Sequence, residues 1–370
     1  MTLRTKKKSP GPKLPDPELL DLMFSDMQKA DIQWKPSDYW LKKYCHPGAA
    51  ILKKYGFDNF RDYNYPSLGM VYTFTKGLNI NAGSLKWYIF ELVKKIPGFS
   101  HLFQLYENNI AYLKRTMSKQ HAELLRLLYF SAVQMDPADS LLKISDSMAG
   151  NPTEPLVIEN RNYTYDFLRF FLRYCYAARY VDFRKIDCIM EIGSGYGGQA
   201  EIVAKIHPHM KFILIDVPPM SYVNEQYLNA AFPGKVLSYR NIRTMDTIRP
   251  QQISGKNFFI LCPWNMSQLG EACSMLWSVN AFMTMEMQTF ENYLAHIRRL
   301  ISKYIVLISP NSGIKKKEAF KSEETIDAKK EREVFTKDFY PLNERDEQKK
   351  EYKTAMFNLP DNLFMIFKKK

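Results

Sequence analysis

The sequence predicts an α/β fold, in which a helical N-terminal accessory region precedes a doubly wound, mostly parallel sheet that ends in an antiparallel hairpin. Three observations predict it. The apolar strand at 189–192 runs into a glycine-rich turn and then a helix. A second β-branched strand ends in Asp216, and further buried strands follow at the spacing of parallel crossovers. Residues 19–148, in contrast, carry apolar clusters at helical spacing.

The glycine-rich turn indicates that a cofactor binds at the end of its strand. Gly193, Gly195 and Gly198 match the G-x-G-x-x-G spacing of dinucleotide-binding proteins, so the glycines alone leave two kinds of cofactor open. A carboxylate at Glu191 would repel a pyrophosphate, whereas it can accept hydrogen bonds from the ammonium of an amino-acid-like cofactor. This favours S-adenosylmethionine, a zwitterion that carries a sulfonium. The residues expected to contact it here are Glu191, Gly193, Ser194, Gly195, Tyr196 and Gly197.

The strand at 211–217 supplies the acid expected to hold the ribose of a nucleotide-type cofactor. Asp216 follows the glycine turn by roughly 20 residues, where a carboxylate can accept hydrogen bonds from both ribose hydroxyls. Val217 is expected to contact the cofactor beside it. Residues 199–206 between the two strands show helical apolar spacing, and His207-Pro208 ends that helix. A β-α-β unit is therefore predicted.

The later elements continue the alternation of helices and strands. The helix that starts after Pro218-Pro219 ends at Pro233-Gly234. The sequence then predicts buried strands at 258–262, 279–283 and 304–308, a helix at 289–302, a charged helical excursion at about 313–353, and a terminal hairpin of strands 354–357 and 363–367.

Three regions are expected along the chain. Residues 1–18 are basic and interrupted by prolines, which predicts a disordered tail. Residues 19–148 form the helical accessory region, a candidate for substrate binding, which prolines and glycines break into short helices rather than a coiled coil. Residues 149–370 form the cofactor-binding domain, with the charged insertion at about 313–353.

The composition limits the kinds of partner and site that the protein can have. A net charge of +13 suggests anionic partners, namely nucleic acid, a lipid surface or a phosphorylated sugar, although part of the excess lies in the two chain ends. The five cysteines include no C-x-x-C pair, so neither a zinc site nor a disulfide framework is indicated. No apolar run approaches the roughly 18 residues of a membrane span. We expect a cytoplasmic protein, and the sequence leaves its oligomeric state open.

The motifs resemble those of a known class of enzymes. Glu191-x-Gly193-x-Gly195-x-Gly197 followed by Asp216 is similar to the first two motifs of class I S-adenosylmethionine-dependent methyltransferases, whose sheet also ends in a strand hairpin. A longer set of sequence segments resembles the sugar O-methyltransferase family of bacterial surface-polysaccharide loci. These segments are residues 190–201, residues 215–218, the tyrosine-bearing helix to Phe232-Pro233, and Met285-Glu286-Met287 followed by Tyr293.

This resemblance covers roughly residues 150–311. The family's usual Ser-Phe-x-Glu-Met stretch becomes Ala-Phe-Met-Thr-Met-Glu-Met at 281–287. The resemblance implies a Rossmann-like class I methyltransferase sheet, S-adenosylmethionine as cofactor, and methylation of a hydroxyl on a sugar nucleotide or a surface glycan.

Glu286 is the leading candidate for a catalytic base. A sugar hydroxyl is a poor nucleophile, so its proton must leave to a positioned base, or a metal must lower its pKa. Glu286 should lie at a strand end beside the cofactor crevice. The alternative is that it caps the helix that follows, where the helix dipole favours a carboxylate. A divalent metal at Asp216 and Glu286 is a further alternative, but no paired-carboxylate motif supports one.

Pro263 and Trp264 follow the strand after the ribose acid, where this architecture places residues against the adenine. Trp264 is expected either to stack on the base or to belong to the core.

Three other functions compete with sugar O-methylation. The basic charge favours a nucleic-acid methyltransferase, but the chain lacks the Asn/Asp-Pro-Pro-aromatic signature of base amino-methylation, so nucleic acid is the less favoured partner. Methylation of another small molecule and a non-catalytic binding protein of the same fold are the remaining alternatives.

Overall fold

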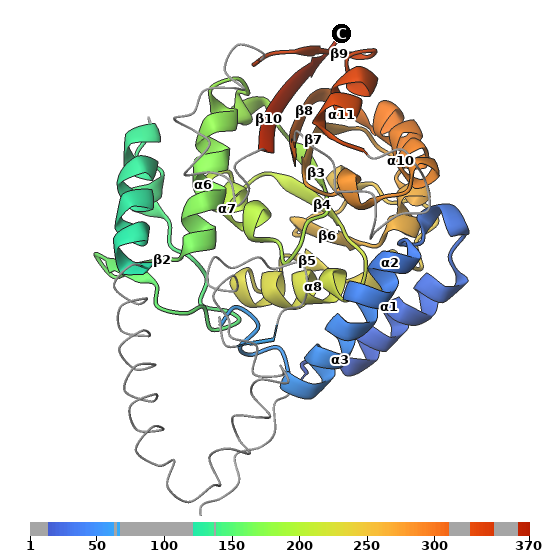
Figure 1. Ribbon diagram of the computed structural model, residues 1–370, viewed down its shortest axis with the longest axis horizontal. Helices are drawn as coiled ribbons and strands as arrows, with labels where there is room; N and C mark the ends of the chain where they lie inside the picture. Colours follow the sequence, from blue (N-terminus) through green and yellow to red (C-terminus); the bar gives the residue numbers. More distant parts are fainter. Residues whose placement is uncertain (1–13, 63–64, 67–120, 137, 311–325, 344–361) are drawn as a thin grey trace, which may run out of the picture.

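The computed structural model describes residues 14–62, 65–66, 121–136, 138–310, 326–343 and 362–370 (Figure 1). The front part of the chain is helical where it is described, and residues 1–13 of the expected tail lie outside the described residues. Its elements are α1 (Pro17–Lys29), the 3-10 turn η1 (Ile32–Trp34), α2 (Asp38–Trp40), the π-helical turn η2 (Leu41–Cys45), α3 (His46–Tyr55), a helix over 121–135, and the 3-10 turn η4 (Leu141–Lys143).

The second part alternates strands and helices. Its strands are β1 (Leu156–Ile158), β2 (Arg161–Tyr163), β3 (Cys188–Ile192), β4 (Lys211–Ile215), β5 (Val236–Leu237), β6 (Phe258–Leu261), β7 (Cys273–Val279), β8 (Ile301–Pro310), β9 (Phe339–Pro341) and β10 (Asn362–Lys369). Its helices are α6 (Tyr165–Ala178), α7 (Gly198–Ile206), α8 (Met220–Ala231), α9 (Tyr239–Ile242), α10 (Met287–Leu300) and α11 (Ala328–Phe335), and its 3-10 turns are η5 (Phe183–Lys185), η6 (Pro250–Gln252), η7 (Pro263–Gln268) and η8 (Phe282–Thr284).

Eight strands form one sheet in the order β5-β6-β4-β3-β7-β8-β10-β9. The strands from β5 to β8 in this order are parallel, and β10 runs antiparallel to both β8 and β9. The chain builds outward from β3 through β4 and then returns to add β7 on the other side, so a topological switch point lies between β3 and β7. The predicted fold class, a doubly wound and mostly parallel α/β sheet with antiparallel terminal strands, is confirmed.

The sheet is buried on both faces because its strands are apolar throughout. Neighbouring residues of β3 enter different cores: Ile189 packs with residues of α6, α7 and α8, whereas Met190 packs with residues of α10 and α11. Figure 1 shows α6 and α7 on one side of the sheet and α10 and α11 on the other. The carboxyl ends of the parallel strands therefore form the open edge at which a ligand can bind.

The strand predicted at 279–283 is wrong. β7 occupies Cys273–Val279 between β3 and β8, and it ends because Asn280 takes a left-handed φ of 55°. Two serines interrupt the apolar run of β7, which is why an apolar pattern places the strand too late. The hydroxyl of Ser278 is nevertheless satisfied, since it donates to the carbonyl of Ile192 at 3.1 Å.

The terminal strands also differ from the prediction. The proposed strand at 354–357 lies outside the described residues, and β10 pairs instead with β8 and with β9. Both α11 and β9 fall within the segment predicted to be a solvated helical excursion: α11 is helical as predicted, but it is not fully solvated, and strand β9 is not predicted. Although α11 is rich in charged residues, it is an amphipathic helix, and its apolar side buries Val334 and Phe335 in the core.

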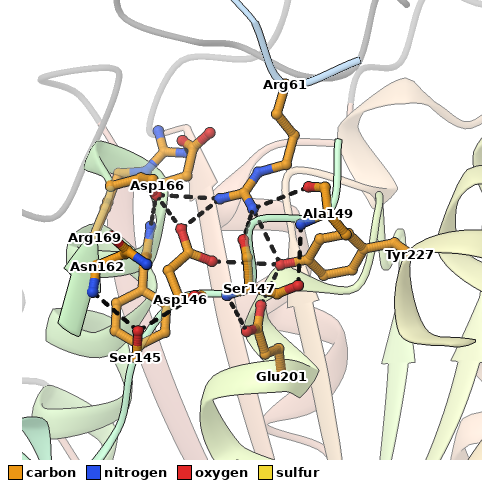
Figure 2. A network of polar contacts seen from close by, with 12 residues as sticks. Arg61, Ser145, Asp146, Ser147, Ala149, Asn162, Asp166, Arg169, Glu201 and Tyr227 are labelled. Atoms are coloured by element: carbon orange, nitrogen blue, oxygen red, sulfur yellow. Dashed lines mark hydrogen bonds and ion pairs between the residues drawn. The ribbon is translucent and has the colours of Figure 1, made fainter. Parts of the chain in front are cut away.

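A buried arginine joins the front region to the sheet domain (Figure 2). The Arg61 Nη2 atom lies 2.6 Å from Asp146 Oδ2, and both side chains are almost fully buried. Arg61 Nη1 donates to the carbonyl of Ser147 at 2.6 Å and to the hydroxyl of Tyr227 at 3.3 Å. The guanidinium also lies over the ring of Tyr196, 5.3 Å from its centre. This Arg61 cluster thus connects residue 61 to α8 and to the glycine turn.

We predict that Arg61→Met destabilises the protein by about 3–5 kcal/mol, because it leaves the buried carboxylate of Asp146 without its cation. Arg126→Met is the matched control: Arg126 pairs with Glu123 at the surface, where both side chains are more than half exposed, and its loss should cost at most about 1 kcal/mol. Urea unfolding of the two variants measures the difference. Equal losses would contradict this account of the Arg61 cluster.

Candidate functional site

A cavity of about 630 Å³ opens at the carboxyl ends of β3, β4 and β7. This strand-end cavity lies beside the switch point of the sheet, where open α/β folds bind ligands. Four parts of the chain line it: the front segment 34–44, helix α6, the glycine turn with the Asp216 region, and the segment 279–293.

Most of the predicted site residues meet in the strand-end cavity. Those that line it are Glu191, Gly193, Ser194, Gly195, Tyr196, Asp216, Val217, Pro263 and Glu286. Gly197 and Trp264 are not part of this lining. Gly197 turns the chain into α7 with a φ of 91°, and Trp264 donates from its indole Nε1 to the hydroxyl of Tyr239 at 2.9 Å.

The glycine turn is shaped by close contacts on one side and open space on the other. Gly193 has a φ of 75°, and a Cβ there would lie 2.6 Å from the Cβ of Ala281. Gly195 has a φ of 56°, but a Cβ there would meet nothing within 4 Å. Both positions favour glycine by conformation. Gly195 alone leaves room for a ligand against the backbone.

Asp216 fixes the turn from the neighbouring strand. Its carboxylate accepts hydrogen bonds from the backbone N–H groups of Gly195 and Val217, each at 2.7 Å. Burial raises the pKa of Asp216 to about 7, against the opposing effect of these two hydrogen bonds. Asp216 lines the cavity, and its carboxylate can accept further hydrogen bonds there.

Glu191 places a second carboxyl group at the same edge. It is 5% exposed, and it lies on the strand next to the one that carries Asp216. Burial raises its pKa well above the ordinary value, the charge of Asp216 adds to this, and Arg173 opposes it. A cationic ligand group beside Glu191 would favour the ionised form in the same way.

Glu286 occupies the N-cap position of α10, as the alternative reading of this residue expected. Its side chain, however, makes no capping hydrogen bond. The residue is half-buried and lines the strand-end cavity. It therefore shares this cavity with the glycine turn and Asp216.

Sequence reasoning missed two groups of residues in the cavity wall. One is the front segment, which contributes Trp34, Lys35, Pro36, Ser37, Trp40, Lys43 and Tyr44. The other belongs to α6 and comprises Asp166, Arg169, Phe170 and Arg173. No local sequence pattern predicts the first group, because these residues reach the cavity only through tertiary packing. The second has a signal in the sequence: two arginines four residues apart lie on one side of a mostly apolar helix.

The described part of the chain contains no group of three or more His, Cys, Asp and Glu side chains placed to hold a metal ion. None of its helices is long and apolar enough to cross a membrane. The five cysteines are buried free thiols.

Comparison with known proteins gives similarity to solved structures alone. No protein-family model matches the chain, and no curated protein matches it. Magnesium protoporphyrin IX methyltransferase from Synechocystis PCC 6803, solved with bound S-adenosylmethionine, has 11% identity and a TM-score of 0.33 over 56% of this chain and 78% of that chain.

Two further structures are similar at the same level. An O-methyltransferase family protein from Burkholderia thailandensis has 9% identity and a TM-score of 0.34 over 55% of this chain and 60% of its own. Mitomycin 7-O-methyltransferase has 9% identity and a TM-score of 0.31 over 55% and 54%. At these values the likeness assigns no residue and no substrate. Nothing in it points to a sugar, so the sugar acceptor stays a prediction.

The two turn glycines make a matched pair for mutation. We predict that Gly195→Ala lowers the stability by only about 1–2 kcal/mol, the cost of an L residue in the left-handed region, but prevents ligand binding because its methyl group projects into open space at the cavity. Gly193→Ala adds a collision with Ala281 and should unfold at a lower temperature. Thermal unfolding and calorimetric titration with S-adenosylhomocysteine measure both. The account fails if Gly195→Ala binds like the unmodified protein.

Proposed function

We propose that the protein is an S-adenosylmethionine-dependent O-methyltransferase. The observation that carries this proposal is the hydrogen bond from the Gly195 N–H to Asp216. In a dinucleotide site, amides of the turn and of the helix that follows bind phosphate. Here a turn amide is already used by a carboxylate, and a second acid, Glu191, borders the same space. The turn therefore suits a cationic amino-acid group better than a pyrophosphate.

Each acid has a distinct part in the proposed cofactor site. Glu191 accepts hydrogen bonds from the cofactor ammonium, and Asp216 accepts them from the ribose hydroxyls. The turn residues Gly193 to Tyr196 contact the region between these groups, with Val217 and Pro263 on the side of the base. Trp264 is left out of this proposal because it is not part of the cavity lining.

The acceptor is proposed to bind between the front segment and the start of α10. Aromatic side chains of Trp34, Trp40 and Tyr44 line the cavity there together with Lys43. Flat aromatic faces beside cationic groups fit a sugar or a sugar nucleotide. The resemblance of 150–311 to sugar O-methyltransferases supports the same acceptor class. The accessory region would then select the substrate.

Methyl transfer to a hydroxyl requires that the acceptor oxygen be aligned with the methyl group, that water be excluded and that a group accept the hydroxyl proton. S-adenosylmethionine supplies the methyl group: the bond from methyl carbon to sulfur breaks while the bond to the acceptor oxygen forms, which leaves S-adenosylhomocysteine and a methyl ether. Glu286 is proposed to take the hydroxyl proton. Its side chain makes no capping hydrogen bond to the start of α10 and borders the cavity.

Cofactor choice is tested by calorimetry. We expect S-adenosylhomocysteine to bind at micromolar concentration and NAD not to bind. Labelled S-adenosylmethionine incubated with a panel of sugar nucleotides and surface glycans then tests the acceptor. Binding of NAD together with no binding of S-adenosylhomocysteine would overturn the proposed function, whereas transfer to a non-sugar hydroxyl would overturn only the acceptor class.

The role of Glu286 is tested by Glu286→Gln. We expect turnover to fall by about 10²–10⁴-fold, because the hydroxyl proton loses its acceptor. Affinity for S-adenosylhomocysteine should stay unchanged. Glu291→Gln is the control, since Glu291 lies on the same helix with its side chain exposed outside the cavity lining. Retained turnover in Glu286→Gln would remove the residue from the mechanism.

Cofactor affinity should depend on pH through Asp216. Its pKa is raised to about 7, so the carboxyl group is protonated below that pH and ionised above it. Only the ionised form accepts hydrogen bonds from both ribose hydroxyls, so affinity for S-adenosylhomocysteine should rise between pH 6 and pH 8. Asp216→Asn should bind more weakly at pH 8 and flatten the rise. An equally steep rise in this variant would assign the titration to Glu191 instead.

A further inference from the structure

Helix α6 places two buried arginines in the wall of the strand-end cavity. Arg169 and Arg173 are each 5% exposed, and both line the cavity. They are four residues apart, so they lie on the same side of the helix one turn from each other. A guanidinium is rarely this deeply buried unless it is paired.

The pairing of these two side chains is incomplete in the described part of the chain. Arg169 donates from Nη2 to Asp166 Oδ1 at 2.9 Å, but its Nε and Nη1 atoms are buried without a hydrogen-bond partner. The Nε atom of Arg173 is likewise buried without one. The ring of Phe170 lies beside both guanidinium groups, and an aromatic face accepts no ordinary hydrogen bond. Buried donors of this kind are costly unless a ligand satisfies them.

The electrostatics of the two arginines also favour an anion beside them. Burial lowers the pKa of Arg173 to about 9, and the like charge of Arg169 adds to this, while Asp166 and Glu191 oppose it. Two guanidinium groups that repel each other beside a cavity are stabilised by an anion between them. A carboxylate matches the planar fork of a guanidinium and accepts two hydrogen bonds from it.

The position of Glu191 identifies the source of that carboxylate. Arg173 and Glu191 both line the strand-end cavity, and the charge of Arg173 opposes the rise in the pKa of Glu191. In an α-amino acid, the ammonium and the carboxylate are attached to one carbon atom, so the protein groups that bind them must be neighbours. Glu191 is the proposed partner of the cofactor ammonium. We propose that Arg173, supported by Arg169, binds the carboxylate of the amino-acid part of S-adenosylmethionine.

This inference rests on the proposed function and makes the site selective for the complete amino acid. Glu191 and the arginines would recognise the two charged groups on the same carbon, and Asp216 would recognise the nucleoside. A ligand that keeps the nucleoside but lacks the amino acid, such as 5′-methylthioadenosine, should gain nothing from Arg173.

The test compares two ligands on matched arginine variants. S-adenosylhomocysteine and 5′-methylthioadenosine are titrated calorimetrically into the unmodified protein, Arg173→Gln, Arg169→Gln and Arg179→Gln. Arg179 is the control because it follows α6 as its exposed C-cap residue and lies outside the cavity lining. We expect Arg173→Gln to weaken S-adenosylhomocysteine by about 10- to 100-fold and to leave 5′-methylthioadenosine unchanged. Arg169→Gln should have a smaller effect of the same kind.

Thermal unfolding separates a binding role from a structural one. Since Arg173 lacks a full set of partners, Arg173→Gln without ligand should melt no lower than the unmodified protein, whereas the stabilisation produced by S-adenosylhomocysteine should shrink. Arg173→Lys keeps the charge but not the fork, and should retain part of the affinity.

Several outcomes would overturn the inference. One is equal weakening of both ligands in Arg173→Gln. Another is unchanged affinity for S-adenosylhomocysteine with a raised KM for the acceptor, which would assign the arginines to an anion on the acceptor. Binding of neither ligand to the unmodified protein would instead overturn the proposed function itself.

Discussion

The hydrogen bonds that Asp216 accepts from Gly195 and Val217 are the constraint on which the site depends. They tie the turn after β3 to the end of β4, so the shape of the turn follows from the parallel register of the two strands. They also keep a carboxylate buried at a strand end despite the cost of desolvation. A turn held in this way opens its Gly195 face toward the cavity and presents an acid where a phosphate-binding turn presents N–H groups.

Support for the turn comes from a part of the chain that is distant in sequence. Tyr196 packs against Tyr227 of α8, with ring centres 4.9 Å apart, and the Arg61 guanidinium lies over both rings. The pKa of Arg61 is raised well above its usual range because Asp146 and the two tyrosines outweigh its burial. The front region therefore supports the glycine turn through Arg61 and also lines the cavity through the segment 34–44. Both parts of the chain contribute to the same cavity.

The local unit of the site could be predicted from sequence, whereas its walls could not. A strand, a glycine turn, a helix and a second strand with a terminal acid are encoded by neighbouring residues, and Glu191, Gly195 and Asp216 lie where the pattern predicts. Trp34 and Trp40 reach the cavity only because α1, η1 and α2 pack onto the sheet domain, which no local pattern describes. The two arginines of α6 lie between these cases: their spacing is visible in the sequence, but their orientation depends on the packing of α6 against α7.

The charges of the cavity wall explain why a zwitterion fits better than a polyanion. Among the described residues its acids are Asp166, Glu191, Asp216 and Glu286, and its cations are Lys35, Lys43, Arg169 and Arg173. A dinucleotide or a nucleic-acid strand would bring several phosphates against four carboxyl groups. A sulfonium amino acid carries both signs within a few bonds, so each of its charges can face an opposite one. The net charge of +13 belongs to the chain as a whole, whereas the cavity wall carries four acidic and four basic side chains among the described residues.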